Sequence, residues 1–308
     1  MPGLAGGSGT VVVKDETQRM RLGSFKALGG VFAVAQIVQD AAGGADLASE
    51  TARAAAGGMT FITASAGNHG LSVAAGARIF GARGVIVLGS AVPEAFAARI
   101  HGMGAEVVRV DGSYEDSIAH AVDAADRQGW LLLADGSWEG CTERPALVME
   151  GYTVLAEECR SAFSASGDWP THVFLQAGVG GLAGAISAHI REHWTVQPHI
   201  TIVEPEAAPC LLKSIEASAL TRADGGWSNM GRLDCKDASL IAFEALQRDA
   251  DCFVTVTDAE AEAAVQDYAE HRLFTTPSGA ATLAAFRAVN LGAHARCLLI
   301  ATEGPEAA

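Results

Sequence analysis

Positively charged residues are scarce in this sequence. It has 21 Lys and Arg against 36 Asp and Glu, which gives a formal net charge of -15 over 308 residues. A chain with this charge repels phosphate backbones and anionic membrane surfaces. We therefore expect that it binds neither nucleic acid nor membranes.

Long apolar runs are also missing. No stretch approaches the roughly 20 apolar residues that a helix needs to cross a bilayer. The first residues, MPGLAGGSGT, lack the basic segment and apolar core of a signal peptide. We expect a soluble cytoplasmic protein. Because 49% of the residues are hydrophobic, the chain can bury a large core, and its length favours about two domains.

The sequence has little that indicates a metal centre. Its six cysteines show no C-x-x-C spacing, so neither a zinc site nor a redox pair is predicted. The nine histidines are dispersed, and we expect none of them to have a second histidine one helical turn away. A metal-centred mechanism is therefore not expected.

What is present is an alternation of short apolar runs and Ala-rich stretches of helical period. This pattern predicts an α/β fold with two domains, each built on a mostly parallel open sheet flanked by helices. The predicted strands, rich in β-branched residues, cover residues 60–63, 85–88, 107–110, 131–133, 173–175, 200–203, 253–256 and 298–300. The predicted helices cover residues 68–80, 114–128, 144–159, 183–193, 258–271 and 278–289.

A polar segment, SAFSASGDWPT (161–171), separates the earlier strands from the later ones. We interpret it as a crossing between domains. The predicted large domain combines residues 1–54 with 161–308, and the smaller α/β domain covers residues 55–160 and carries SAGNHG.

Lys26 stands in SFKALGG (24–30), where it opens an apolar helical stretch. Because Phe25 and Ala27 flank it, its ammonium is expected to be partly desolvated, which favours the neutral amine that attacks a carbonyl group. A surface lysine whose stem lies along apolar neighbours is the alternative interpretation.

The segment SAGNHG (65–70) lies between a predicted strand and a predicted helix. Main-chain N–H groups at a helix start, next to small residues, form a turn that suits a carboxylate. Asn68 adds an amide group to this turn. An ordinary helix N-cap would explain the same asparagine.

The third motif is QAGVGGLAG (176–184), which follows a predicted strand and leads into a helix. Its glycines expose successive N–H groups that suit a phosphate at a helix N-terminus. A tight packing turn is one alternative. The dinucleotide fingerprint of a nicotinamide dehydrogenase is another, although Ala183 stands at the place of its third glycine.

An amine nucleophile, a carboxylate turn and a phosphate-binding loop are together what an amino acid bound to pyridoxal phosphate (PLP) requires. In this order the motifs resemble those of the fold type II PLP enzymes, the tryptophan synthase β superfamily. Other segments resemble diaminopropionate ammonia-lyase, and the resemblance runs from about residue 11 to 303. These segments are VKDET (13–17), GSFKALGG (23–30), DGSWEG (135–140), PALVMEGY (145–152), VEPEAAPC (203–210) and TTPSGAA (275–281).

The resemblance implies a role for each matched residue. Lys26 holds the cofactor as a Schiff base, Asn68 bonds the ring hydroxyl, and Lys26 or Asp135 acts as the catalytic base. Thr302, or Ser278 as the second candidate, faces the pyridine nitrogen, and a hydroxyl there leaves that nitrogen largely unprotonated. The phosphate-binding residues are Gly178, Val179, Gly180, Gly181 and Leu182, and the substrate-carboxylate residues are Ser65, Ala66, Gly67, Asn68 and His69.

The function implied by the resemblance is β-elimination from a small amino acid, with 2,3-diaminopropionate giving pyruvate and ammonia. A serine/threonine dehydratase is the alternative within the same class, and β-replacement is less favoured. A PLP-fold protein that binds an amino acid without turnover is the non-enzyme alternative. A homodimer is expected.

Two departures from the family pattern stand out. Ala66 replaces the aspartate that the lyases carry before G-N-H-G, and that aspartate resembles the proton acceptor for the D isomer, so an L-selective enzyme is predicted. The chain also begins shortly before Lys26, and we expect either a truncated start or a more open site. Cys210 and Cys235 are predicted to lie close together, because the resemblance places both near the substrate entrance.

Overall fold

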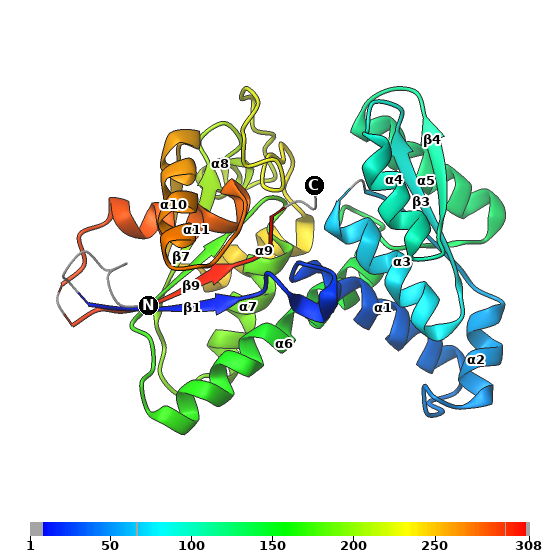
Figure 1. The fold of residues 1–308 in the computed structure, drawn as a ribbon, viewed down its shortest axis with the longest axis horizontal. Helices are drawn as coiled ribbons and strands as arrows, with labels where there is room; N and C mark the ends of the chain where they lie inside the picture. The colour runs from blue at the N-terminus through cyan, green and yellow to red at the C-terminus, as the bar shows by residue number, and fades with distance from the viewer. Residues whose placement is uncertain (1–8, 66, 293, 306–308) are drawn as a thin grey trace. The chain divides into compact units, whose positions relative to one another are not determined.

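The computed structural model describes residues 9–65, 67–292 and 294–305. The chain divides into two compact units (Figure 1). The larger unit combines Met1–Phe25, Gly136–Thr142 and Tyr152–Ala308, and the smaller unit combines Lys26–Asp135 with Glu143–Gly151.

These units have other bounds than the predicted domains, 1–54 with 161–308 and 55–160. The difference is largest for helix α1 (Lys26–Ala41), which belongs to the smaller unit because it packs against helix α3 (Asn68–Phe80). Val34 and Val38 of α1 are fully buried. Composition does not change at this boundary, so the sequence alone does not reveal it.

The larger unit is built on a five-stranded sheet in the order β1-β9-β6-β7-β8. Every neighbouring pair in it is parallel, which confirms the predicted sheet type. Its strands are β1 (Thr10–Asp15), β6 (His172–Gln176), β7 (His199–Pro205), β8 (Cys252–Val256) and β9 (Arg296–Ala301).

Helices pack on the sheet of the larger unit and on one another. Helix α11 packs across β6 to β9, α10 packs on α11, and α7 packs against β6 and α9. The larger unit contains η1 (Arg19–Arg21), α7 (Gly181–His193), α8 (Cys210–Ala217), α9 (Leu240–Asp249), α10 (Asp258–Glu270) and α11 (Pro277–Ala288), and it shares α6 (Glu143–Ser166) with the smaller unit.

The main apolar core of the larger unit lies between its sheet and helices α10 and α11. Phe174 of β6 and Phe286 of α11 meet edge to face, with ring centroids 6.1 Å apart. Leu283 and Leu299 are fully buried in the same cluster. Burial of such side chains stabilises the fold by about 1.5–3 kcal/mol each.

The segment at residues 161–171, predicted as a crossing between domains, lies entirely in the larger unit, and its first half is helical because α6 continues to Ser166. The segment is polar in composition, but its helical period buries Phe163 and exposes serines. Gly167 ends the helix in the left-handed conformation, with φ 77°, and donates its N–H to Phe163 O at 2.8 Å.

The smaller unit contains a four-stranded parallel sheet in the order β4-β3-β2-β5. Helix α5 packs on β2 and β3, and α3 packs on the same strands and on α1. The remaining elements are β2 (Thr60–Ala64), β3 (Arg83–Gly89), β4 (Glu106–Val110), β5 (Leu131–Leu132), α2 (Glu50–Gly57), α4 (Glu94–Gly102) and α5 (Tyr114–Gln128). Among the described residues, no helix is long and apolar enough to cross a membrane.

Candidate active site

The glycine loop joins the end of β6 to the start of α7. Gly180 is the N-cap of α7 and has φ +99°, a conformation that favours glycine. A Cβ at Gly180 would lie 3.0 Å from a Leu211 methyl, and one at Gly178 would lie 2.9 Å from Cys235 Sγ. The loop therefore needs glycine for its backbone shape and for its close packing.

This loop has the geometry of an anion site. The first hydrogen bond inside α7 is from Gly184 N–H to Gly180 O at 2.8 Å, so the earlier amides of the helix have no acceptor within it. The helix dipole adds a partial positive charge at the same end. The arrangement suits a phosphate group, and the tight packing is compatible with that role.

Two buried hydroxyls in the larger unit are the candidates for the pyridine nitrogen. Thr302 follows β9 and is 4% exposed, and Ser278 in the first turn of α11 is 2% exposed. Thr302 Oγ1 accepts from Gln176 Nε2 at 3.2 Å, and Ser278 Oγ accepts from the Arg232 N–H at 3.1 Å. Both oxygens thus accept a hydrogen bond from the protein.

The residues just before Lys26 are anchored to the same part of the larger unit. Phe25 N–H donates to Thr302 O at 3.0 Å, and Ser24 forms an antiparallel bridge with Glu303. Glu303 is 5% exposed and accepts from Thr276 Oγ1 at 2.6 Å. The chain segment that leads into Lys26 is therefore held beside Thr302 by main-chain bonds.

In the smaller unit, Lys26 and Asp135 form an ion pair. Lys26 Nζ lies 3.0 Å from Asp135 Oδ2, and the two side chains are 21% and 24% exposed. Lys26 begins α1, and Asp135 follows the short strand β5. The fold thus brings together two residues that lie 109 positions apart in the sequence and that we predicted as the catalytic pair.

The charge of Asp135 is set by its neighbours. Partial burial works against ionisation, but the Lys26 ammonium and the hydrogen bond that it donates outweigh it. Together they lower the pKa of Asp135 to about 2. The carboxyl group is therefore ionised at neutral pH.

His69 is one of the predicted substrate-carboxylate residues, and its side chain has a structural partner. Its ring is 2% exposed, and its Nε2 lies 2.8 Å from Leu133 O. Because a carbonyl only accepts, Nε2 carries the hydrogen. Burial lowers the pKa of His69, so the ring is neutral. The side chain ties α3 to the segment that leads to Asp135, and only the main chain of His69 remains available for a substrate carboxylate.

The turn that was predicted to hold the carboxylate lies between β2 and α3. Gly67 is the N-cap of α3, so Asn68 is the first helical residue and not the cap. Ser65 Oγ accepts from Gly67 N–H at 3.3 Å, and the first helical bond is from Leu71 N–H to Gly67 O at 3.2 Å. The amides between them suit an anion. Ala66 lies outside the described residues.

Gln176 was not predicted as a site residue. It is a buried polar side chain at the end of β6 that donates a hydrogen bond to the Thr302 hydroxyl. A polar residue directly after a run of buried strand residues was the available signal. Nor did we predict the Ser137 and Ser239 hydroxyls, which lie 2.8 Å apart and join the DGSWEG segment to the start of α9. Only the tertiary structure shows that these residues meet.

Cys210 and Cys235 are both free thiols. Both adjoin Gly178, because Cys210 Sγ lies 3.5 Å from Gly178 O and Cys235 Sγ would lie 2.9 Å from a Cβ at Gly178. Burial, together with the charge of Glu204, strongly raises the pKa of the Cys210 thiol. The uncharged thiol is therefore the stable form of Cys210.

The expectation about histidine spacing is wrong. His189 and His193 stand one turn apart on α7, with ring centroids 4.7 Å apart, and His189 Nε2 lies 3.2 Å from Glu157 Oε2. The described residues nevertheless contain no group of three or more side chains that could hold a metal ion.

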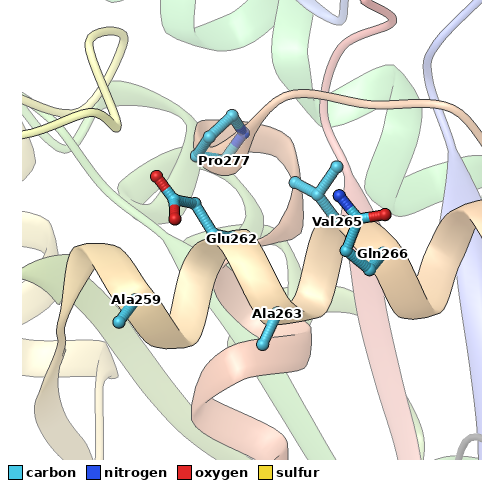
Figure 2. A pocket seen from close by; sticks show the side chains of 6 residues that line it. All are labelled: Ala259, Glu262, Ala263, Val265, Gln266 and Pro277. Atoms are coloured by element: carbon cyan, nitrogen blue, oxygen red, sulfur yellow. The ribbon is translucent and has the colours of Figure 1, made fainter.

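A surface pocket on α10 offers little chemistry. Figure 2 shows its lining: Glu262 and Val265 extend from α10 toward Pro277, and Ala259, Ala263 and Gln266 lie along the same helix. That carboxylate accepts from Asn229 Nδ2 at 2.7 Å. This pocket contains none of the predicted site residues.

The chain has an α/β fold, a lysine–carboxylate pair, a turn that suits a carboxylate and a glycine-rich loop that suits a phosphate. These are the features of enzymes that bind an amino acid through a phosphorylated carbonyl cofactor. A family model described as "Pyridoxal-phosphate dependent enzyme" matches residues 1–303. The chain belongs to this family, and its cofactor is pyridoxal 5'-phosphate.

Two relatives and one solved structure illustrate the similarity. Diaminopropionate ammonia-lyase of Escherichia coli (strain K12) is 32% identical over 317 residues, covering 96% of this chain and 80% of the relative. A crystal structure of the E. coli lyase, in complex with an aminoacrylate-PLP azomethine reaction intermediate, has a TM-score of 0.85 and 30% identity and covers 98% and 82% of the two chains. A probable D-serine dehydratase of Rhizobium leguminosarum bv. trifolii (strain WSM2304) is 28% identical, covering 66% of this chain and 48% of the relative. The expected fold type and family resemblance are confirmed.

Proposed function

We propose that this protein is a PLP-dependent lyase that eliminates the β-amino group of 2,3-diaminopropionate and releases pyruvate and ammonia. The observation that carries the proposal is the Lys26–Asp135 pair, with Nζ and Oδ2 3.0 Å apart. It joins a nucleophilic amine to an ionised carboxylate in one unit. The similarity to diaminopropionate ammonia-lyase supports the choice of substrate.

Lys26 is the residue proposed to hold the cofactor covalently. When bound, PLP withdraws electrons from the substrate's α-carbon and so stabilises the charge left by proton removal. Phe25 is fixed to Thr302 O, which limits the freedom of the main chain at Lys26. The lysine amine is therefore presented from a defined backbone position.

Asp135 is proposed to accept the α-proton, with Lys26 as the other candidate base. With the Lys26 ammonium beside it, the pKa of Asp135 is about 2, and such a carboxylate is a weak base. A cofactor held covalently by Lys26 would replace the free ammonium beside Asp135. Wherever the Lys26 nitrogen is uncharged, the pKa of Asp135 would rise toward its ordinary range and the carboxylate would be a better proton acceptor.

The remaining site residues are proposed to bind and orient. The loop residues Gly178, Val179, Gly180, Gly181 and Leu182 hold the phosphate through main-chain N–H groups. The turn at Ser65, Gly67 and Asn68, with the main chain of His69, holds the substrate carboxylate. Asn68 bonds the ring hydroxyl, and Thr302 or Ser278 meets the ring nitrogen.

A serine/threonine dehydratase is the second candidate function. The sequence Ser65-Ala66-Gly67-Asn68 resembles that of the dehydratases, and one relative is a probable D-serine dehydratase. Water instead of ammonia would leave from the β-carbon. Binding without turnover is the non-enzyme alternative.

The decisive experiment measures pyruvate release from L- and D-2,3-diaminopropionate and from L-serine by the PLP-loaded protein. Lys26→Ala is the control, because it should abolish turnover and change the visible absorption of the bound cofactor. Preferred turnover of L-serine would favour the dehydratase. A Lys26→Ala protein with the colour and rate of the wild type would rule out the proposed role of Lys26.

We also propose a homodimer in the cytoplasm, as the family resemblance implies. Free thiols at all six cysteines are compatible with a reducing compartment. Sedimentation of the purified protein tests the oligomeric state, and a monomeric mass at micromolar concentration would contradict the homodimer.

A further inference from the structure

The Gln176 side chain has an unusual set of partners. It lies at the end of β6, is 2% exposed, and its Nε2 is 3.0 Å from Ile300 O and 3.2 Å from Thr302 Oγ1. The carbonyls of Ser278 and Gly279 lie 3.3 and 3.4 Å from the same nitrogen. Three of these four partners are carbonyl oxygens, which only accept, so the NH₂ group must point toward them.

This orientation decides how Thr302 bonds. Because Gln176 donates, the Thr302 oxygen accepts, and the hydroxyl keeps its own hydrogen for another acceptor. Across the described residues, Gln176 is the one side chain that bonds the Thr302 hydroxyl. Thr302 therefore offers a hydrogen-bond donor to whatever group binds beside it.

Gln176 is also poorly suited to a purely structural role. Its Oε1 is buried, and no partner among the described residues bonds it. An unpaired buried carbonyl oxygen is destabilising, because it has given up its hydrogen bonds to water without a replacement. A residue that served only to fill this space would avoid that cost with an apolar side chain.

We propose that Gln176 is a positioning residue that makes the Thr302 hydroxyl a hydrogen-bond donor to the PLP ring nitrogen, so that this nitrogen stays unprotonated. The inference rests on the cofactor placement proposed above. A protonated nitrogen has no lone pair to accept the hydroxyl hydrogen, whereas a neutral one does. Gln176 thereby limits how strongly the ring withdraws electrons, which favours elimination over chemistry that needs a long-lived carbanion.

The same geometry predicts the effect of losing the donor. Gln176→Met keeps the length of the side chain but has no N–H. The Thr302 hydroxyl then no longer receives the N–H that lay 3.2 Å away, while Ile300 O loses its bond from Gln176 and keeps the one from Thr282 Oγ1. If the hydroxyl turns to donate there, it presents a lone pair to the ring nitrogen and favours the protonated form.

The test loads the protein with PLP that carries ¹⁵N at the ring position and records the ¹⁵N chemical shift as the pH is varied. The variants are Gln176→Met, Thr302→Val and the double variant, and Thr302→Ser is the matched control that keeps a hydroxyl. We expect an unprotonated nitrogen in the wild type and in Thr302→Ser. In Gln176→Met the protonated fraction should rise at least about tenfold, which corresponds to one pKa unit.

The double variant shows whether Gln176 acts through Thr302. If Gln176 acts through Thr302, adding Gln176→Met to Thr302→Val should leave the ¹⁵N shift unchanged. An equal shift in both backgrounds would overturn the proposal, and so would a Gln176→Met protein that is less stable but has the wild-type ¹⁵N shift. A response to Ser278→Ala in place of Thr302→Val would assign the ring nitrogen to Ser278 and also overturn it.

The experiment must be separable from a variant that does not fold and from a failure of the proposed function. Gln176→Asn keeps the amide but is one methylene too short to reach Thr302, and it serves as the second variant if the methionine protein does not fold. The ¹⁵N measurement requires PLP binding and no turnover. Absence of pyruvate release would therefore count against the proposed substrate and leave the inference about Gln176 open to the same measurement.

Discussion

At the scale of single residues, two partly or fully buried carboxyl groups behave in opposite ways. Desolvation opposes the charge on both Asp135 and Glu204. Asp135 has the Lys26 ammonium 3.0 Å away, and its pKa falls to about 2. Glu204 has only main-chain donors and a thiol as partners, burial dominates, and its pKa rises to about 7. The charge of the neighbouring group therefore decides whether the pKa of a buried carboxyl group falls or rises.

The proposed base can be tested by Asp135→Asn, which keeps the shape of the side chain and removes its ability to accept the α-proton. We expect turnover of L-2,3-diaminopropionate to fall by roughly 10²- to 10⁴-fold. The measurement is pyruvate release under saturating substrate, with PLP absorbance confirming cofactor loading. If Asp135 merely orients a neighbouring group, the loss will stay within a few-fold, and Lys26 becomes the favoured base.

Ala66 leads to a prediction about stereochemistry. The family resemblance implies that residue 66 stands where the D isomer needs a proton acceptor, and an alanine side chain has no group that could take a proton. We expect selectivity for L-2,3-diaminopropionate, and we expect Ala66→Asp to raise the activity on the D isomer by about 10²-fold. Rates on both isomers check this, with Ala66→Asn as the matched control. Equal rates on D and L in the wild type would show that the argument is wrong.

The raised pKa of Glu204 should make the free energy of unfolding depend on pH. Its folded-state pKa, about 7, lies above the ordinary value of 4.5, so the folded protein binds more protons than the unfolded chain between these values. The contribution of Glu204 is therefore complete below pH 4.5 and decreases as the pH rises to 7, by about 3 kcal/mol in the free energy of unfolding. Urea unfolding across this range should show a flatter pH dependence for Glu204→Gln. A variant curve parallel to that of the wild type would contradict the role of Glu204.

At the scale of elements, the glycine loop makes the sharpest prediction. Gly180→Asp would place a carboxylate at the proposed phosphate site and should weaken PLP binding at least about tenfold beyond the effect of Gly180→Ala. The alanine variant is the control for strain, because any side chain here meets φ +99° and the Leu211 methyl at 3.0 Å. Fluorescence titration with PLP measures both affinities. Equal affinities would mean that the loop is only a packing turn.

Elements were predictable where their residues follow one simple period. Helices α3 and α5 were expected over the residues that form them, and each of the expected strands overlaps a strand in the structure. Helices α2, α4, α8 and α9 were not predicted, since each has only eight to ten residues. A helix that short has few periodic positions, and packing against neighbours stabilises it more than its own propensity does.

At the scale of the whole molecule, cofactor binding should stabilise the folded state. PLP binds the folded chain and not the unfolded one, so saturation at about 100 times Kd adds about 2.7 kcal/mol to the free energy of unfolding. Removal of PLP should therefore lower the Tm, as measured by calorimetry with and without added PLP. Gly180→Asp should show a smaller difference between the two states. A wild-type Tm that does not respond to PLP would contradict this expectation.

The predicted site residues are divided between the two compact units. Asp135 and Lys26 belong to the smaller unit, whereas the glycine loop and Thr302 belong to the larger one. The boundary between the units falls between Phe25 and Lys26, and again between Asp135 and Gly136. The segments before and after these two residues are thus assigned to different units, although nothing in the local composition marks the change.

The sequence by itself determined the α/β class, the parallel sheets, the PLP family and the three motifs, because each depends on local residue order: period, strand–turn–helix succession and glycine spacing. The proposed roles of the site residues remain predictions. Only the tertiary structure decided that Lys26 meets Asp135, that His69 turns inward to Leu133 O, and that Gln176 holds Thr302. These are contacts between residues 64 to 126 positions apart. Such contacts depend on how strands are ordered and helices packed, and no local pattern in the sequence records them.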